Sequence, residues 1–340
     1  MKKKIFLAIG LLLLIGFIAN RDIIVYGFRQ LQGQLAIIRN TEPVDRILQN
    51  PSVADTIKQK LRLIESVRKY AIDSLCLKNT KNYQTFYDQQ GKPLLWVLNA
   101  APPFSMESYK WKYPFLGKLS YKGFFNKQIG LKEEQQFISK GYDTDLSPVS
   151  AWSTLGWFSD PVLSGMLKRS EGSLAELIIH EMTHATLYVK GDVEFNENLA
   201  TFIGEKGAEK FISEIIPVKL NDYKFRLEDN KLYSSYVVNS VKQLDSLYMD
   251  THFLSLTNEK KYTEKYRLIA SILAEMNKLP YHMPERYRWD FSKEKLPGNT
   301  WFLSFSDYHK AQPMLQQIYN DSCNKDVKTL IEYFKKKYGK

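Results

Sequence analysis

A helical segment with two histidines four residues apart constrains the fold of this chain more than any other feature. The stretch from Ser173 to Gly207, SLAELIIHEMTHATLYVKGDVEFNENLATFIGEKG, contains the motif HEMTH. Residues i and i+4 share one face of a helix, so His180 and His184 can point their imidazoles at a single metal ion. Glu181 then lies beside them, where its carboxylate can take a proton from water. The segment predicts a metal-binding helix.

The ends of this helix and the chain that follows predict a third ligand. Ser173 and Glu176 are spaced as a capping box, and Gly191 suits the C-terminal cap. If the chain reverses at Gly191, a second helix brings Glu197 back to the level of His184. Small residues on the face that carries Glu197 would let the two helices approach closely: Ala200, Thr201, Gly204 and Ala208.

The predicted metal ligands are therefore His180, His184 and Glu197, with Glu181 as the catalytic base. Three protein ligands and one open position are typical of catalytic zinc, so we expect one Zn²⁺ per chain. The alternative is that the histidines are ordinary core residues and that Glu197 is a surface carboxylate. The chain has five histidines in all, and chance would place two of them in this pattern on the order of once in a hundred sequences.

The N-terminus has the layout of a secretory signal peptide or a signal anchor. Three lysines at positions 2–4 precede the apolar run IFLAIGLLLLIGFIA, residues 5–19. No good small-residue cleavage site follows, which favours an uncleaved anchor. As a helix the run reaches about 22 Å, short of a ~30 Å hydrocarbon core, although Ile23 to Tyr26 could extend it. We expect residues 1–21 to be this leader and residues 22–340 to form one domain outside the cytoplasm, in the cell envelope.

Charge and cysteine content narrow the range of partners. The formal net charge is +11, and the lysines are spread along the chain, which favours a basic surface near anionic lipid or envelope polymer. No RNA-recognition or finger motif is present, so we expect no nucleic-acid partner. The two cysteines, Cys76 and Cys323, are compatible both with a disulfide and with two free thiols.

Hydrophobic periodicity predicts a predominantly helical α+β fold. Helices are expected at 22–39, 52–75 and 131–139, and apolar stripes at helical spacing recur within 233–247, 266–276 and 327–334. Between Tyr83 and Phe125, the segments YQTFY and LLWVLNA flank a turn at residues 90–93, and KLSYKGFF follows. These segments predict a small mixed or antiparallel sheet of three or four strands. The aromatic segment VSAWSTLGWF, residues 149–158, predicts a further strand.

Several segments together resemble one bacterial family. NENLATF after HEMTH resembles the Asn-Glu-x-x-Ala pattern of gluzincin metallopeptidases, in which the Glu is the third zinc ligand. The HEMTH segment, together with AWSTLGWFSDPVLSGML, GQLAIIRN, WVLNAAPPFS, YKGFF and NTWFLSFSDYHKAQPML, resembles the bacterial putative zinc aminopeptidases over about residues 26–320. The resemblance implies a zincin-like metallopeptidase domain that hydrolyses peptides as an aminopeptidase.

Two features of related proteins are missing, and they keep an alternative open. No lipobox cysteine follows the apolar run, so lipid anchoring is not supported. The Gly-x-Met-x-Asn block with which well-known gluzincin aminopeptidases bind a free amino terminus is also absent. A zinc endopeptidase therefore remains an alternative, as does a non-catalytic, metal-stabilised interaction protein of the cell envelope.

The resemblance also implies roles for residues around the metal. Zinc would polarise a peptide carbonyl while Glu181 passes a proton from water to the leaving amine. The strand at 149–158 could pair with an extended substrate, or could simply belong to the core. Candidate donors to the oxyanion are Tyr121, Tyr188 and Tyr308. Candidate hydrogen-bond partners for the histidines are Asp192, Glu194 and Asn196.

Overall fold

The computed structural model describes residues 21–113, 117–149, 159–306 and 312–338. Within these residues the chain is mostly helical and carries three small sheets, so the predicted α+β class is confirmed. Both cysteines are free thiols, Cys323 in the core and Cys76 half-buried. Short 3₁₀ helices lie at Ser164–Lys168, Pro217–Lys219 and Pro284–Arg286.

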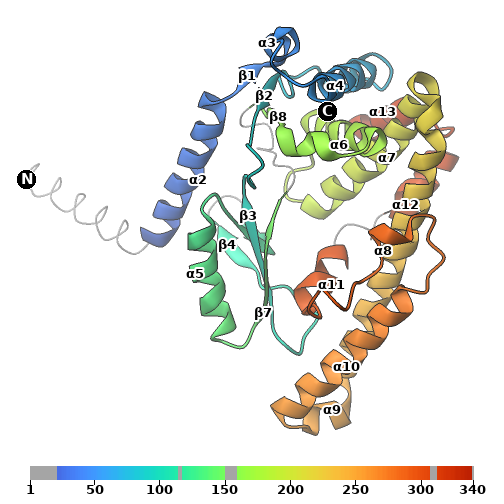
Figure 1. The fold of residues 1–340 in the computed structure, drawn as a ribbon. Helices are drawn as coiled ribbons and strands as arrows, with labels where there is room; N and C mark the ends of the chain where they lie inside the picture. Colours follow the sequence, from blue (N-terminus) through green and yellow to red (C-terminus); the bar gives the residue numbers. More distant parts are fainter. Residues whose placement is uncertain (1–20, 114–116, 150–158, 307–311, 339–340) are drawn as a thin grey trace, which may run out of the picture.

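A helical layer surrounds the largest hydrophobic core. It is built from α4 (Asp55–Asp73), α6 (Glu171–Thr186), α7 (Val193–Ile215), α12 (Gln312–Asp321) and α13 (Val327–Lys337), seen in the upper part of Figure 1. Each of these helices turns apolar side chains inward, and the fully buried ones include Leu61, Ile178, Ile203, Phe211 and Phe334. Because α12 and α13 pack on α7, the C-terminal segment supports the helix that carries Glu197.

A three-stranded antiparallel sheet lies below this layer. Its order is β6 (Tyr121–Phe124), β3 (Trp96–Ala101), β7 (Asp143–Pro148), and α5 (Lys127–Ile138) packs on it. The predicted helix at 131–139 is thus present but begins earlier, because Asn126 caps it by accepting a hydrogen bond from the Gln128 amide at 2.9 Å.

The predicted pairing of the strands needs a correction. A turn does separate β2 (Thr85–Tyr87) from β3, with left-handed φ angles at Gln90 and Gly91. However, β2 pairs with β1 (Glu42–Pro43) and with β8 (Val162–Leu163), so the two segments belong to different sheets. A third ladder joins β4 (Trp111–Tyr113) to β5 (Gly117–Leu119). Hydrophobic alternation located the strands but could not choose their partners, since pairing depends on distant segments.

The strand predicted at 149–158 lies outside the described residues, except for Val149. The Val149 amide donates to the Leu95 carbonyl at 3.0 Å but belongs to no strand. The element that pairs along β3 at this point of the chain is β7, which ends at Pro148. The proposed role of the 149–158 segment in substrate pairing therefore stays a prediction.

A helical arm extends from the layer past the sheet. The long α8 (Leu220–Met249) runs down one side, α9 (Thr251–Ser255) turns the chain, and α10 (Asn258–Met276) returns, as Figure 1 shows. The arm has its own hydrophobic cluster around Val237, Leu273 and Phe302, the last from α11 (Asn299–Ser306). The predicted stripes at 233–247 and 266–276 therefore face each other inside the arm.

The first described helix lies on the outside of the molecule. α2 (Arg21–Arg39) matches the predicted helix at 22–39, and a short α3 (Val44–Gln49) follows it. The apolar run at residues 5–19 lies outside the described residues. Among the helices that the structure describes, none is both long and apolar enough to cross a membrane.

Candidate metal centre

Helix α6 presents both histidines on one side. It begins at Glu171, and its N-cap is Ser170, whose side chain accepts a hydrogen bond from the Ser173 amide at 3.4 Å. The predicted capping box was therefore wrong: Ser173 lies inside the first turn, and Glu176 is turned away to accept from Tyr223 Oη at 2.9 Å and to pair with Arg226. The cap position moved because Ser170 offers an earlier capping oxygen, so the helix starts one turn sooner.

The chain reverses between α6 and α7 as predicted, but α6 ends sooner than expected. Its last residue is Thr186, the next residue is extended, and a turn follows at Lys190 and Gly191, where the φ of +86° suits glycine. Asp192 caps α7 by accepting from the Phe195 amide at 3.0 Å. Gly204 explains the close approach of the two helices, because a Cβ there would lie 3.0 Å from the Glu176 carbonyl oxygen.

The reversal brings the three predicted ligands together. The Nε2 atoms of His180 and His184 are 3.1 Å apart. Glu197 Oε2 lies 3.5 Å from His180 Nε2, and Glu197 Oε1 lies 3.4 Å from His184 Nε2. One ligand atom from each residue thus falls within 4.8 Å of the others, so the group could hold a metal ion.

The spacing of these atoms fits zinc. Ligand atoms bound to Zn²⁺ at about 2.0–2.2 Å in tetrahedral geometry lie roughly 3.4 Å from one another. Two imidazole nitrogens and a carboxylate oxygen are also among the donors that zinc prefers. The burial of the site leaves little water to screen the charges, with 6% of the His184 side chain and 27% of the Glu197 side chain exposed.

The electrostatics keep the carboxylate ionised. Burial alone would raise the pKa of Glu197, but the imidazoles of His180 and His184 beside it lower that pKa to about 2. Burial works in the opposite direction on His180, whose pKa is nevertheless raised because Glu197, Glu181 and Glu176 surround it. The carboxylates around His180 therefore favour a positive charge at this position.

Glu181 differs from the ligands in having a free oxygen. Its Oε2 atom is buried and, within the part of the chain that the structure describes, accepts no hydrogen bond. An unpaired buried acceptor costs free energy, so such an atom is uncommon unless a ligand or water completes it. This is the oxygen that a general base would offer to water.

None of the predicted supports is hydrogen-bonded to an imidazole among the described residues. Asn196 clamps the reversal instead: its Oδ1 accepts from the Val189 amide and its Nδ2 donates to the Val189 carbonyl, both at 2.8 Å. Asp192 caps α7, and the Glu194 carbonyl accepts from Asn198 Nδ2 at 2.8 Å. The Nδ1 atom of His184 is buried without a hydrogen-bond partner among the described residues. Asn196 therefore fixes the backbone between the ligands rather than a ring.

Two of the three candidate tyrosines lie beside the ligands. The ring of Tyr188 is 6.5 Å from that of His184. Burial raises the pKa of Tyr121, and the neighbouring Glu197 and Tyr188 raise it further. Tyr121 is the first residue of β6, so the sheet brings it to the helical layer. Tyr308 lies outside the described residues.

The sequence did not reveal the groups that lie behind the helix pair. Tyr83 is fully buried, its hydroxyl has no hydrogen-bond partner among the described residues, and burial raises its pKa together with nearby Glu181 and Asp160. Arg226 comes from α8 to pair with Glu176, one turn before His180. No local pattern marks either residue, because each reaches the site from a distant segment. The positive φ of 62° at Tyr83 cannot be read from the sequence.

Comparison with known proteins identifies the family. A family model described as "Putative aminopeptidase" matches residues 25–338. The chain belongs to the putative aminopeptidase family. No curated protein and no solved structure matches the chain. The match to this aminopeptidase family confirms the resemblance seen in the sequence, and its name points to a hydrolase that cuts peptides.

Proposed function

We propose that this member of the putative aminopeptidase family is a zinc-dependent peptidase that removes residues from the amino terminus of peptides. The observation that carries the proposal is the convergence of His180, His184 and Glu197 next to Glu181 with its unpartnered oxygen. A site that only clamps two helices has no need of Glu181, so this carboxylate favours an enzyme over a structural metal site.

The roles of the residues follow from their positions. When bound, zinc supplies a Lewis acid that activates water and polarises the substrate carbonyl. Glu181 takes the proton from the attacking water and delivers it to the leaving amine. Glu197 stays ionised and neutralises part of the cation's charge. The hydroxyls of Tyr121 and Tyr188 are the donors proposed to stabilise the oxyanion, each as one hydrogen bond.

The same proposal includes the cellular location. The three lysines and the apolar run at residues 2–19 are typical of a segment that is inserted in the cytoplasmic membrane or cleaved on export. The catalytic body would then act in the cell envelope on peptides outside the cytoplasm. Protease accessibility tests the location independently of activity. Protease added outside the cytoplasmic membrane should digest the catalytic body if that body lies in the cell envelope, and should leave it intact if the body lies in the cytoplasm.

The decisive experiment combines metal content with turnover on the full chain. Elemental analysis should find one zinc per chain in the parent, in Glu181→Gln and in the control His282→Ala, which changes an exposed histidine of another region. His184→Ala should hold none. Hydrolysis should persist only in the parent and in His282→Ala, since losing a general base costs about 10²–10⁴-fold.

The substrate set separates the remaining alternatives. Matched peptides with free and acetylated amino termini are cut alike by an endopeptidase, whereas an aminopeptidase releases the first residue of the free peptides only. Zinc bound without hydrolysis of any peptide would support the non-catalytic envelope protein. Equal metal in the parent and in His184→Ala would overturn the site itself.

A further inference from the structure

Helix α2 has two apolar faces, and the described part of the chain covers only one of them. On the inner face, the ring of Tyr26 packs 5.8 Å from Tyr113 and 6.2 Å from Phe124. Gln30 Nε2 donates to the Gly123 carbonyl at 2.9 Å, and Gly33 lies directly under the ring of Phe125. These contacts fix α2 to β6 and to the start of α5.

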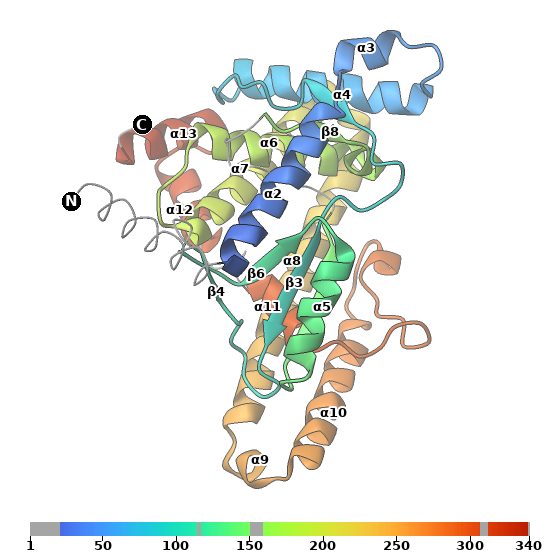
Figure 2. The same cartoon turned by 90° about the vertical axis from the view of Figure 1, so that its left-hand side faces the viewer.

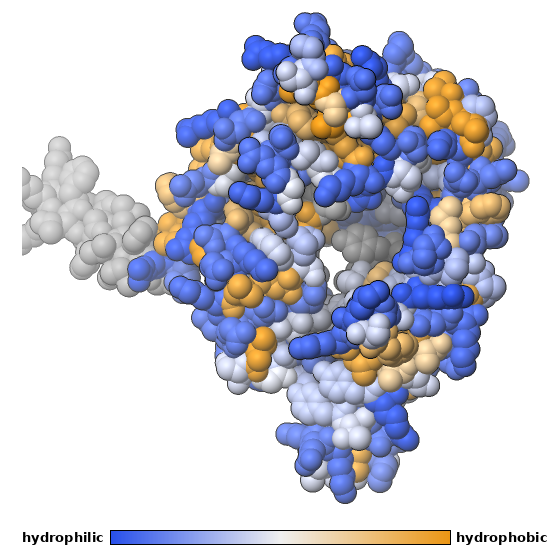
Figure 3. All heavy atoms as spheres, in the orientation of Figure 1, coloured by the Kyte–Doolittle hydropathy of each residue, from blue (hydrophilic) through white to orange (hydrophobic). Residues whose placement is uncertain are grey.

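The outer face carries a stripe of large apolar side chains. Ile24, Phe28 and Leu31 are 40%, 68% and 46% exposed. Their i, i+4, i+7 spacing places them on one line along the helix. Figure 2 shows α2 at the front of the molecule on this side, and Figure 3 shows hydrophobic residues at the edge where Figure 1 places α2. We call these three residues the α2 stripe.

The chain before α2 indicates what covers the stripe. The apolar run at residues 5–19 ends two residues before Arg21, where α2 begins. If this run inserts in a bilayer, α2 begins close to the surface of that bilayer, because only Asn20 separates the two segments. Because Tyr26 is already packed against Tyr113, α2 belongs to the folded body and does not continue a membrane span. Arg21 and Arg39 are exposed at the two ends of α2, where anionic headgroups would accept hydrogen bonds from them.

We propose that α2 lies flat on the surface of an anionic bilayer, with the α2 stripe among the acyl chains and its terminal arginines at the headgroups. An interfacial helix buries its apolar face roughly 5–10 Å into the boundary between headgroups and chains. The net charge of +11 favours the same anionic surface. Because α2 is fixed to β6, this contact also holds the metal centre at a set orientation to the membrane, whether or not the site is catalytic.

Spin labels on the full chain test the contact. Phe28→Cys and Leu31→Cys place a nitroxide on the stripe, and Ala36→Cys places one at an exposed position off the stripe. Each is made in a Cys76→Ser, Cys323→Ala background and reconstituted in vesicles of phosphatidylcholine and phosphatidylglycerol. Labels at 28 and 31 should be several-fold more accessible to oxygen, relative to a water-soluble nickel chelate, than the label at 36.

One control and two contrary outcomes make the result interpretable. The circular dichroism spectrum of each labelled chain must match the parent, so that a misfolded variant is not counted. Equal access of the nickel chelate to all three positions would overturn the proposal, because the stripe would then face water. Strong dipolar broadening between labels at position 28 of two chains would also overturn it, since a second copy would cover the stripe. None of these readings depends on zinc or on peptide hydrolysis.

Discussion

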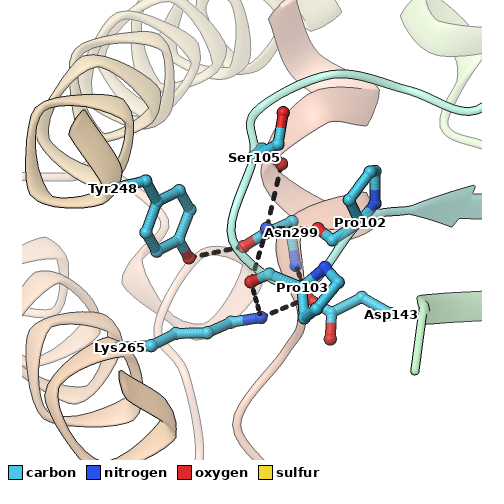
Figure 4. Close-up of polar contacts among 7 residues, drawn as sticks. All are labelled: Pro102, Pro103, Ser105, Asp143, Tyr248, Lys265 and Asn299. Atoms are coloured by element: carbon cyan, nitrogen blue, oxygen red, sulfur yellow. Dashed lines mark hydrogen bonds and ion pairs between the residues drawn. The ribbon is translucent and has the colours of Figure 1, made fainter. Parts of the chain in front are cut away.

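Two buried polar clusters differ in how completely their atoms are paired. In the cluster of Figure 4, where α8 and α10 of the arm meet the start of β7, Lys265 Nζ pairs with Asp143 and donates to the Pro103 carbonyl at 2.9 Å. The backbone N–H of Asn299 donates to Asp143 Oδ2 at 2.8 Å, and the side-chain Oδ1 of Asn299 accepts from Tyr248 Oη at 2.8 Å. The Asn299 side chain also donates to the carbonyls of Pro102, Pro103 and Ser105. We call this cluster the Asp143 node.

The metal centre, in contrast, keeps buried atoms unpaired. Glu181 Oε2 and His184 Nδ1 have no hydrogen-bond partner among the described residues, and three ligand atoms face one another across about the space of an ion. A fully paired cluster fixes segments in place, whereas unpaired buried atoms need something else to complete them. The comparison indicates that the Asp143 node holds the arm to the sheet, whereas the unpaired atoms of α6 and α7 need an ion or another ligand to complete them.

The largest effect is expected from breaking the node. Lys265→Ala leaves Asp143 charged in the interior without its cation, and removing one partner of a buried pair typically costs about 3–5 kcal/mol. Urea unfolding followed by circular dichroism measures this loss. The control Lys260→Ala removes an exposed lysine of the same helix and should change stability by no more than ~0.5 kcal/mol. Equal stability of both variants would contradict a structural role for the node.

The second-largest effect is the stabilisation expected when zinc binds at the centre on α6 and α7. Zinc at about 100 times its dissociation constant should stabilise the parent by roughly 2.7 kcal/mol, because it binds the folded state and completes the unpaired atoms. A thermal scan with zinc and with a chelator measures the shift. His184→Ala should show no shift, whereas His282→Ala, which changes a histidine outside the centre, should keep it. A shift that survives in His184→Ala would mean that zinc binds elsewhere.

A third effect concerns Glu205, a carboxylate for which the described residues provide no ion pair. Burial raises the pKa of Glu205 to about 7, and the neighbouring Glu176 adds to the rise. Between about pH 4.5 and about pH 7, Glu205 is protonated in the folded protein and ionised in the unfolded chain. The free energy of unfolding therefore falls as the pH rises through this range.

Glu205→Gln should remove this dependence. Relative to the parent, the variant should gain on the order of 1–3 kcal/mol between pH 5 and pH 8 in metal-free urea unfolding. Glu194→Gln, a carboxamide substitution at an exposed position of the same helix, serves as the control and should show the pH dependence of the parent. A constant difference between Glu205→Gln and the parent across this pH range would show that Glu205 is ionised in both states.

The sequence was sufficient to predict that the three candidate ligands converge, because the segments that carry them are local. His180 and His184 lie on one helix, and one short reversal at Gly191 returns Glu197 to them. Helical spacing and turn residues therefore predicted this convergence, although they missed the Ser170 cap and the end of α6 at Thr186. The arm helices and α2 followed from apolar periodicity for the same reason.

The sequence could not predict the Asp143 node or the pairing of the sheet. Lys265 is 122 positions from Asp143, and Asn299 is 156 positions from it. A buried lysine looks like any other lysine until the fold brings its partner close. The same holds for Tyr83 beside Glu181, and for β2, whose partners β1 and β8 lie far from the turn that follows it.

The smallest expected effect tests the corrected start of α6. Ser170→Ala removes the oxygen that accepts from the Ser173 amide, so it should cost about 1 kcal/mol, as for other N-cap serines. Ser173→Ala, which would have destroyed the predicted capping box, should change stability by less than ~0.5 kcal/mol. Both are measured by urea unfolding in chelator. If Ser173→Ala proved the costlier change, α6 would begin a turn later, and Glu176 would be engaged in capping. That carboxylate could then not pair with Arg226 one turn before His180, and the support of the metal helix would have to be sought elsewhere.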